Sequence, residues 1–342
     1  MKQYLDLLKD IKENGVIKSD RTGTGTISVF SREIRHSMSN GFPLLTTKKM
    51  AVKQIVTELL WFLKGKTDLK YLIDNNCHIW DGDCYVNYVK LNQFNSNPKW
   101  LKPIPLESGF NGADLYTQEE FIDKIKTDDE FAKKWGELGP IYGKQWRDWN
   151  GIDQIKNLID MLKTNPDSRR LLVSAWNVSD IPNVILPPCH YGFQCYTTEM
   201  NKAERYKKWF DYQKDYILEV SGMSAEDAME HYNFPTRKLS LKFTMRSVDV
   251  GLGIPFNLAS YAILLEILCL ECNMISDELI ASLGDTHIYL NQINGINEQL
   301  TREPYELPKL VINKKNINEY QIDDFKIVNY KYHPTIKLPL SN

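Results

Sequence analysis

Apolar and polar residues alternate along the chain with two different periods, which predicts both helices and strands. Helical spacing occurs in three stretches, 1–15, 51–65 and 152–165, and Gly65 is a natural stop for the second. Alternation with a period of two predicts strands in four others, 22–36, 169–178, 190–196 and 239–247. The pattern therefore predicts an α/β (α+β) fold in which helices pack on a sheet.

The longest apolar run, 253–272, predicts a buried core helix rather than a membrane span. It carries four polar residues that a lipid-facing helix would not tolerate well, Asn257, Ser260, Glu266 and Glu271. The N-terminal helix lacks the unbroken apolar region and the small-residue cleavage site of a signal peptide. We therefore expect a soluble, cytoplasmic protein.

Two polar segments interrupt the regular pattern and predict surface insertions at about 84–135 and 199–238. The first is irregular. The second is expected to form a small helical excursion between two strands, with Ser224 and Asp227 as a capping box. We expect a single catalytic domain over residues 1–342, elaborated by these insertions.

Charge and cysteine content exclude several functions. The 42 Lys and Arg residues balance 44 Asp and Glu residues, so a net charge of −2 gives no general attraction to nucleic acid or acidic membranes. The six cysteines show no disulfide-framework spacing. Cys269 and Cys272 form a CxxC motif on the apolar helix, where core packing is favoured because no second Cys or His pair has zinc-like spacing. No metal site is predicted.

The stretch ILPPCHYGFQCY, residues 185–196, places a cysteine at the rigid entrance of a predicted strand. Pro187 and Pro188 fix two φ angles and remove two backbone donors immediately before Cys189. A thiol at such a stiff position is a candidate nucleophile.

Glu58 is a candidate acid–base group because it lies on an otherwise apolar helix. Desolvation on that face would raise its pKa. The helix pattern alone favours a simpler interpretation, in which this carboxylate turns to solvent or pairs with a lysine.

Four arginines stand beside small residues or turns and are candidates for phosphate binding: Arg21, Arg169, Arg170 and Arg246. The guanidinium group matches phosphate oxygens with two hydrogen bonds, and Ser247 adds a hydroxyl donor. Isolated arginines usually form surface ion pairs, so this pattern is suggestive and leaves that alternative open.

Asn257 follows the proline of GLGIPFN and falls in the first turn of the apolar helix. Its amide can both donate and accept, as reading one edge of a pyrimidine requires, although local sequence alone favours a helix cap. His287 and Tyr289 would face one side if extended. They lie in the stretch 284–300, which we expect to begin the last helical region.

Nine short runs, in this order, resemble the thymidylate synthase family. They are DRTGTGT (20–26), GFPLLTTKK (41–49), ELLWFLKG (58–65), IWD (79–81), LGPIYGKQWR (138–147), DSRR (167–170), LPPCH (186–190), RSVDVGLGIPFNLASY (246–261) and GDTHIY (284–289). The resemblance reaches YHPTIK near the end and leaves out the two insertions. It implies a large mixed sheet with packed helices, and one sheet face forming a homodimer interface.

The resemblance implies transfer of a one-carbon unit from 5,10-methylenetetrahydrofolate to carbon 5 of dUMP, giving dTMP and dihydrofolate. The implied catalytic residues are Cys189, which adds to carbon 6 of the uracil ring, with Glu58, Tyr142, His190 and Asn257. The implied dUMP-binding residues are Arg21, Arg246, Ser247, Asn257, His287 and Tyr289, together with Arg169 and Arg170 from the other subunit. An amide at Asn257 matches uracil rather than cytosine.

On the folate side, the resemblance implies that Asp249 holds the pterin ring. The other implied cofactor-binding residues are Ile79, Trp80, Leu252, Gly253 and Phe256 around the ring system, and Lys48 and Lys49 at the glutamate tail. Nearby arginines are expected to lower the pKa of the nucleophilic thiol.

Two departures from the family pattern keep a second reaction open. Met245 stands where a glutamine is common, and the chain ends in LPLSN, with polar Ser341 and Asn342 in place of an apolar tail. Both favour water at the site, and water capture of the methylene intermediate would make the protein a dUMP hydroxymethylase. Trp80, Asp249 and the run GLGIPFN favour the synthase. A catalytically silent relative that binds nucleotide or RNA is disfavoured, because Cys189 and its expected partners are retained.

Overall fold

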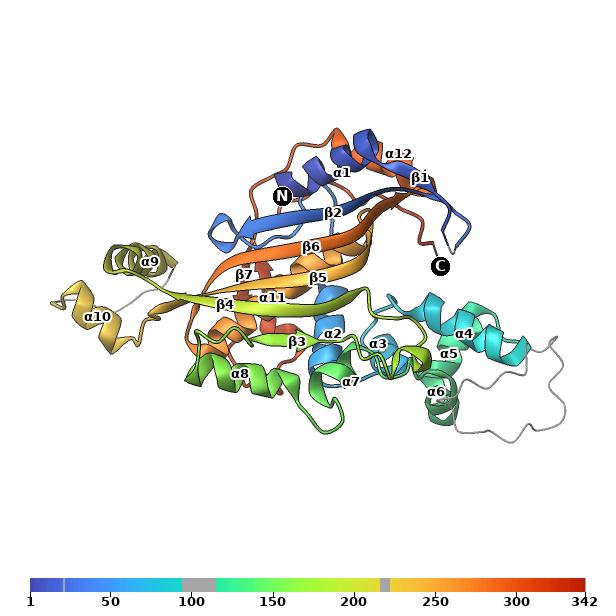
Figure 1. The fold of residues 1–342 in the computed structure, drawn as a ribbon, viewed down its shortest axis with the longest axis horizontal. Coiled ribbons are helices and arrows are strands. Elements are labelled where there is room, and N and C mark those ends of the chain that lie inside the picture. Colours follow the sequence, from blue (N-terminus) through green and yellow to red (C-terminus); the bar gives the residue numbers. More distant parts are fainter. Residues whose placement is uncertain (21, 94–114, 216–221, 342) are drawn as a thin grey trace.

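A six-stranded mixed sheet forms the centre of the fold (Figure 1). The computed structural model describes residues 1–20, 22–93, 115–215 and 222–341. The strand order is β1-β2-β6-β5-β4-β3. The strands are β1 Val16–Lys18, β2 Thr26–Ser37, β3 Leu172–Ser174, β4 His190–Glu199, β5 Arg237–Asp249 and β6 Ile275–Tyr289. In this sheet β5 and β6 pair in parallel, joined by a helical crossover, and the other neighbours are antiparallel.

Helices pack around this sheet, and a small two-stranded sheet is formed by β7 Lys309–Ile312 and β8 Phe325–Val328. The helices are α1 Lys2–Asn14, α2 Val52–Leu63, α3 Leu69–Asp74, α4 Asp81–Gln93, α5 Gln118–Thr127, α6 Asp129–Trp135, α7 Tyr142–Arg147, α8 Gln154–Thr164, α9 Lys202–Asp215, α10 Ala225–His231, α11 Gly253–Cys272 and α12 Ile293–Leu300. Short 3₁₀ turns occur at Met38–Asn40, Ile181–Asn183, Leu290–Gln292 and Ile322–Asp324.

The long helix α11 packs behind β5 and β6 and forms the centre of the core, as predicted (Figure 1). Among the described residues it is the helix whose length and composition would allow it to cross a membrane, but 72% of its most apolar window is buried in the fold. Cys269 is buried within this core, as the interpretation of the CxxC motif required.

The sheet is covered on one face. On β5, Leu239, Leu241 and Phe243 alternate toward the core and are fully buried. The opposite face carries Leu172 and Tyr196, which are 55% and 68% exposed. Leu172 lies opposite Gln194 and therefore shares this face with Tyr196. Two large apolar side chains are thus left exposed on the uncovered face of the sheet.

The predicted helices at 1–15, 51–65, 152–165 and 253–272 are confirmed, as are the strands in 22–36, 190–196 and 239–247. The strand predicted over 169–178 is confirmed only as the three-residue β3. The prediction for 284–300 was wrong in its first part. Residues 284–289 complete β6, and the helix begins only at Ile293.

The prediction of irregular structure over 84–135 was also wrong for the described residues. Helices α4, α5 and α6 flank positions 94–114, which lie outside the description. Tyr88 and Phe121 are buried, with ring centroids 4.9 Å apart, and Tyr88 also meets Trp135 edge-on at 5.2 Å. These aromatic contacts join the segment to the main core.

The segment 199–238 forms two helices, as predicted, and α9 and α10 extend away from the body of the molecule (Figure 1). Ser224 caps α10 by accepting from the Asp227 backbone N–H. The helices enclose a separate small core around Trp209, with Met229 and Phe234. This cluster does not belong to the main core, so we expect it to loosen independently.

Two fully buried tryptophans test this separation, Trp61 in the main core and Trp209 in the small core. Trp61→Ala is expected to lower the free energy of unfolding by about 3–5 kcal/mol. Trp209→Ala is expected to raise hydrogen exchange in α9 and α10 while changing the main thermal transition by less than about 2 °C. Equal shifts of that transition in the two variants would contradict independent unfolding.

Candidate active site

A cavity of about 840 Å³ lies at the end of the sheet where β5 and β6 finish. This is a typical size for a small-molecule site. Most of the residues selected from the sequence line it: Glu58, Ile79, Trp80, Tyr142, Cys189, His190, Arg246, Ser247, Asp249, Leu252, Gly253, Phe256, Asn257, His287 and Tyr289. They come from six helices and strands and the loops between them, and the fold brings them to one hollow.

Cys189 is fixed from two sides at the entrance of β4. Its backbone N–H donates to the Tyr142 hydroxyl at 2.8 Å. The guanidinium of Arg246 donates to the carbonyls of Pro188 (2.9 Å) and Pro187 (2.7 Å). One of its nitrogens, Nη2, also lies 3.9 Å from the Cys189 sulfur. A positive charge at that distance favours the thiolate, which is the nucleophilic form.

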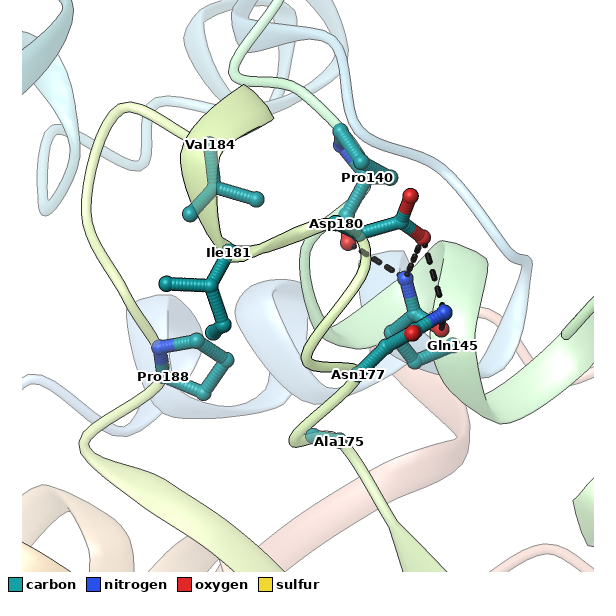
Figure 2. Close-up of a pocket in the computed structure, with 8 residues that line it drawn as sticks. All are labelled: Pro140, Gln145, Ala175, Asn177, Asp180, Ile181, Val184 and Pro188. Carbon is teal, nitrogen blue, oxygen red and sulfur yellow. Dashed lines mark hydrogen bonds between the residues drawn. The ribbon is translucent and has the colours of Figure 1, made fainter.

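The loop that leads to Cys189 is held by a buried polar network (Figure 2). Asp180 accepts from the Gln145 side-chain amide at 2.7 Å and from Asn177 at 3.0 Å. The Gln145 amide also donates to the Pro140 carbonyl at 2.8 Å. Gln145 lies on α7, which also carries Tyr142. Helix α7 therefore holds both the start and the end of this loop.

Glu58 turns into the protein and is 7% exposed, so the interpretation as a solvent-facing carboxylate was wrong. Its Oε1 accepts from the Trp80 indole N–H at 2.8 Å. Burial raises the pKa of Glu58 to about 7, and the hydrogen bond from Trp80 opposes this only in part. Such a carboxyl group can gain or lose a proton near neutral pH.

His190 and Tyr142 stack directly beside this carboxyl group, with ring centroids 4.0 Å apart and planes 14° apart. The His190 Nδ1 atom lies 2.8 Å from the Tyr261 hydroxyl. Burial lowers the pKa of His190 to about 3 and raises the pKa of Tyr142 well above its usual value. Both rings are therefore neutral at pH 7.

His287 and Tyr289 lie at the end of strand β6. They are two residues apart in extended backbone, and both line the cavity. His287 Nδ1 is 3.2 Å from Asp285 Oδ1, an oxygen that also accepts from the Ser28 hydroxyl at 2.7 Å. Arg21 lies outside the described residues. Its neighbour Asp20 lines the cavity and orders the loop by accepting from the backbone N–H groups of Thr22 and Gly25.

Four sequence-selected residues do not line this cavity. Arg169 and Arg170 are exposed just before the edge strand β3. Lys48 is buried, and its ammonium group donates to the Gly251 carbonyl at 2.6 Å. Lys49 is exposed and lies over the Tyr332 ring, 5.4 Å from its centroid.

Burial lowers the pKa of Lys48 to about 8, with the charge of Asp249 opposing this. In this arrangement Lys48 supports the turn after β5.

Several lining residues were not among those selected from the sequence, most of them polar and three from the chain end: Lys18, Ser19, Asp20, Thr22, Thr26, His78, Asp83, Leu186, Asp285, Leu338, Leu340 and Ser341. The pattern of Ile336, Leu338 and Leu340 alternates with a period of two, which was a usable signal for a packed extended tail. Met245, noted as a departure, also lines the cavity and is 3% exposed.

The chain is similar over nearly its full length to characterised proteins. A family profile described as thymidylate synthase matches residues 2–342. A thymidylate synthase of Mycoplasma mobile is 44% identical over 339 residues, which cover 98% of each chain. One from Malacoplasma penetrans is 43% identical over 339 residues and 98% of each chain. One from Listeria monocytogenes is 41% identical over 350 residues and the whole of both chains. The chain belongs to the thymidylate synthase family.

Proposed function

We propose that this protein is a thymidylate synthase, which methylates dUMP at carbon 5 with 5,10-methylenetetrahydrofolate and yields dTMP and dihydrofolate. The observation that carries the proposal is the position of Cys189. Its thiol opens onto a cavity that also holds a guanidinium group, an amide and a buried carboxyl group, from Arg246, Asn257 and Glu58. The names of the full-length relatives support the same activity.

In the proposed reaction the Cys189 thiolate forms a bond to carbon 6 of the uracil ring. The ring electrons move onto carbon 5 and the carbonyl at carbon 4, and carbon 5 then attacks the methylene carbon of the folate. Carbon 5 next loses its proton, tetrahydrofolate leaves, and a hydride from it reduces the exocyclic methylene. Departure of the thiolate restores the ring. Glu58, with His190 and Tyr142 beside it, is the group proposed to move protons through ordered water.

We assign dUMP recognition to groups at the inner end of the cavity. Asn257 is proposed to pair with O4 and N3–H of the uracil, and His287 and Tyr289 with the ribose hydroxyl. Arg246 and Ser247 are proposed to bind the phosphate, together with Arg21. The size of the cavity and the adjacent positions of Arg246 and Ser247 at the end of β5 support this assignment.

We also propose a homodimer in which Arg169 and Arg170 reach the phosphate site of the partner. Two features support this. Both arginines are exposed and do not line the cavity of their own chain, and the uncovered sheet face beside them carries exposed Leu172 and Tyr196.

The folate is proposed to occupy the outer part of the cavity. Asp249 there is flanked by Leu252, Phe256 and Trp80, so that a flat ring with polar edges fits between apolar walls and one carboxylate. The role of Lys48 and Lys49 at the glutamate tail stays a prediction. We further propose a single catalytic domain over residues 1–342 and a cytoplasmic location, where a thiol nucleophile stays reduced.

The reaction product tests the proposed function. We expect dTMP and dihydrofolate in equal amounts, by mass analysis of the nucleotide and by dihydrofolate absorbance. A nucleotide heavier by one oxygen, with tetrahydrofolate regenerated, would show a dUMP hydroxymethylase instead. Absence of any change in dUMP would show a silent relative.

Replacement of the proposed nucleophile is expected to separate chemistry from binding. Cys189→Ala should lower turnover by at least ~10⁴-fold while dUMP binding stays measurable by calorimetry. Cys195→Ala, at a buried cysteine on the same strand, is the matched control and should retain turnover. Turnover that persists in Cys189→Ala would remove the assignment.

The pKa of Glu58 predicts a pH-dependent effect of its removal. Burial raises this pKa from 4.5 to about 7, so the folded protein holds a proton that the unfolded chain releases. The stability from this group is therefore present below pH 4.5 and is lost as pH rises through about 7. Because a tenfold change in an ionisation constant is worth about 1.4 kcal/mol, the ionised group costs roughly 3 kcal/mol.

Glu58→Gln removes that cost. The free energy of unfolding of the variant minus that of wild type should therefore increase by up to ~3 kcal/mol between about pH 5 and about pH 8, as measured by urea unfolding. Its turnover should fall at all pH values. Glu119→Gln, at an exposed position, is the control. A difference between Glu58→Gln and wild type that does not vary with pH would contradict the raised pKa.

A further inference from the structure

The end of the chain, residues 336–341, packs against two glycines, Gly251 and Gly295, and this packing site is its seat. A Cβ atom built on Gly295, in α12, would stand 2.4 Å from Leu338 Cδ2 and 3.0 Å from Ile336 Cγ2. A Cβ atom on Gly251, in the turn after β5, would stand 3.3 Å from Leu338 Cδ1. The 2.4 Å approach leaves no room for a side chain at Gly295 unless Leu338 moves, and the contact at Gly251 is tight. The two glycines therefore give Leu338 its place beside the cavity that it lines.

Gln292 lies beneath this seat, at the start of α12, and is fully buried. Its amide nitrogen donates to Asp249 Oδ2 at 3.2 Å and to the Pro339 carbonyl at 3.1 Å. Its amide oxygen is buried without a hydrogen-bond partner in the part of the chain that is described, and it would lie 2.3 Å from a Cβ atom on Gly251.

The orientation of this amide follows from its neighbours. A carboxylate and a carbonyl both accept hydrogen bonds, so only the nitrogen can face Asp249 and Pro339. Both of its N–H groups are then used. One buried side chain thus contacts, at the same time, a cavity carboxylate and the backbone of the chain end.

Asp249 is oriented by two donors. The Leu252 backbone N–H donates to Oδ1 at 3.0 Å, and Gln292 donates to Oδ2. If the chain end left its seat, the Gln292 amide would lose the Pro339 carbonyl and its buried N–H would have no partner, which is costly. The amide would then be free to turn away from Asp249.

From this geometry we propose that Gln292 is a positioning residue that couples seating of residues 336–341 to the orientation of Asp249. The proposal rests on the proposed function, because it is the folate that Asp249 is expected to hold. Coupling of this kind is reciprocal, so folate binding favours the seated chain end and the seated chain end favours folate binding.

Two variants test the coupling, one by changing Gln292 itself and one by changing the packing site of the chain end. Gln292→Met keeps the length of the side chain and removes both donors. Gly295→Ala leaves Gln292 intact but places a methyl group where Leu338 lies. The matched control is Gln299→Met. Gln299 is equally buried on α12, but its amide donates to Thr47 and it makes no hydrogen bond to the chain end.

We expect Gln292→Met and Gly295→Ala to raise the KM for methylenetetrahydrofolate by about tenfold, the effect of losing one hydrogen bond to a charged group. The KM for dUMP should change by less than about twofold. Hydrogen exchange of residues 336–341, measured with dUMP and a non-reactive folate analogue, should be slow in wild type and Gln299→Met and fast in the two test variants.

The outcomes separate this proposal from the proposed function. Wild-type protein that does not make dTMP would overturn the synthase assignment. If wild type is active, wild-type folate KM and tail protection in Gln292→Met would overturn the positioning role alone. An equal rise of the folate KM in Gln299→Met would also overturn it, because the effect would then be a general loss of core packing.

Discussion

The site depends on how Arg246 holds the two prolines before Cys189. Proline has no backbone N–H, so Pro187 and Pro188 cannot donate to a regular ladder, and here the Arg246 guanidinium group fixes them by donating to both of their carbonyls. The same group stands 3.9 Å from the sulfur. Three constraints are therefore met by one side chain: the loop is fixed, its carbonyls are satisfied, and the thiol has a cation beside it.

Two aromatic rings that line the same cavity as this charge are neutral. Burial lowers the pKa of His190 to about 3 and raises that of Tyr142, so neither ring carries charge at pH 7. Glu58, with a pKa of about 7, is the group among these three whose ionisation changes near neutral pH. Burial of the carboxyl group in the packed protein produces this value. Packing and acid–base chemistry thus have the same physical origin in this pocket.

The sequence pattern was sufficient to predict the strongly periodic helices and strands. It was insufficient where contacts with neighbouring strands determine the secondary structure. Helices α2 and α11 followed from their apolar spacing. Strand β6 did not, because Ile275, Leu279 and Leu283 repeat every four residues as in a helix, and extended structure arises there from pairing with β2 and β5. The ordered aromatic contacts of the 84–135 segment were hidden by its polar composition.

The residues of the sequence motifs line one cavity. Each of them lies near a strand end, a proline or a similar position that its helix or strand fixes. Side-chain direction was harder to predict. The helix pattern taken alone favoured a surface position for Glu58, which is buried, because that pattern cannot show that Trp80 offers it a donor. Lys48 donates to the Gly251 carbonyl, a partner that only the tertiary fold reveals.

The end of the chain lies against the cavity although its last residues are polar. The chain presents Leu338 and Leu340 to the cavity, and only then turns polar. Ser341 is anchored by hydroxyl and amide donors from Thr24 and Asn291, both at 3.2 Å. These two hydrogen bonds hold the serine at the cavity where an apolar residue would be held by packing. Met245, buried opposite His190 in the β4–β5 register, likewise adds an apolar surface rather than a water-binding amide. Both departures from the family pattern therefore favour exclusion of water, and with it hydride transfer over water capture.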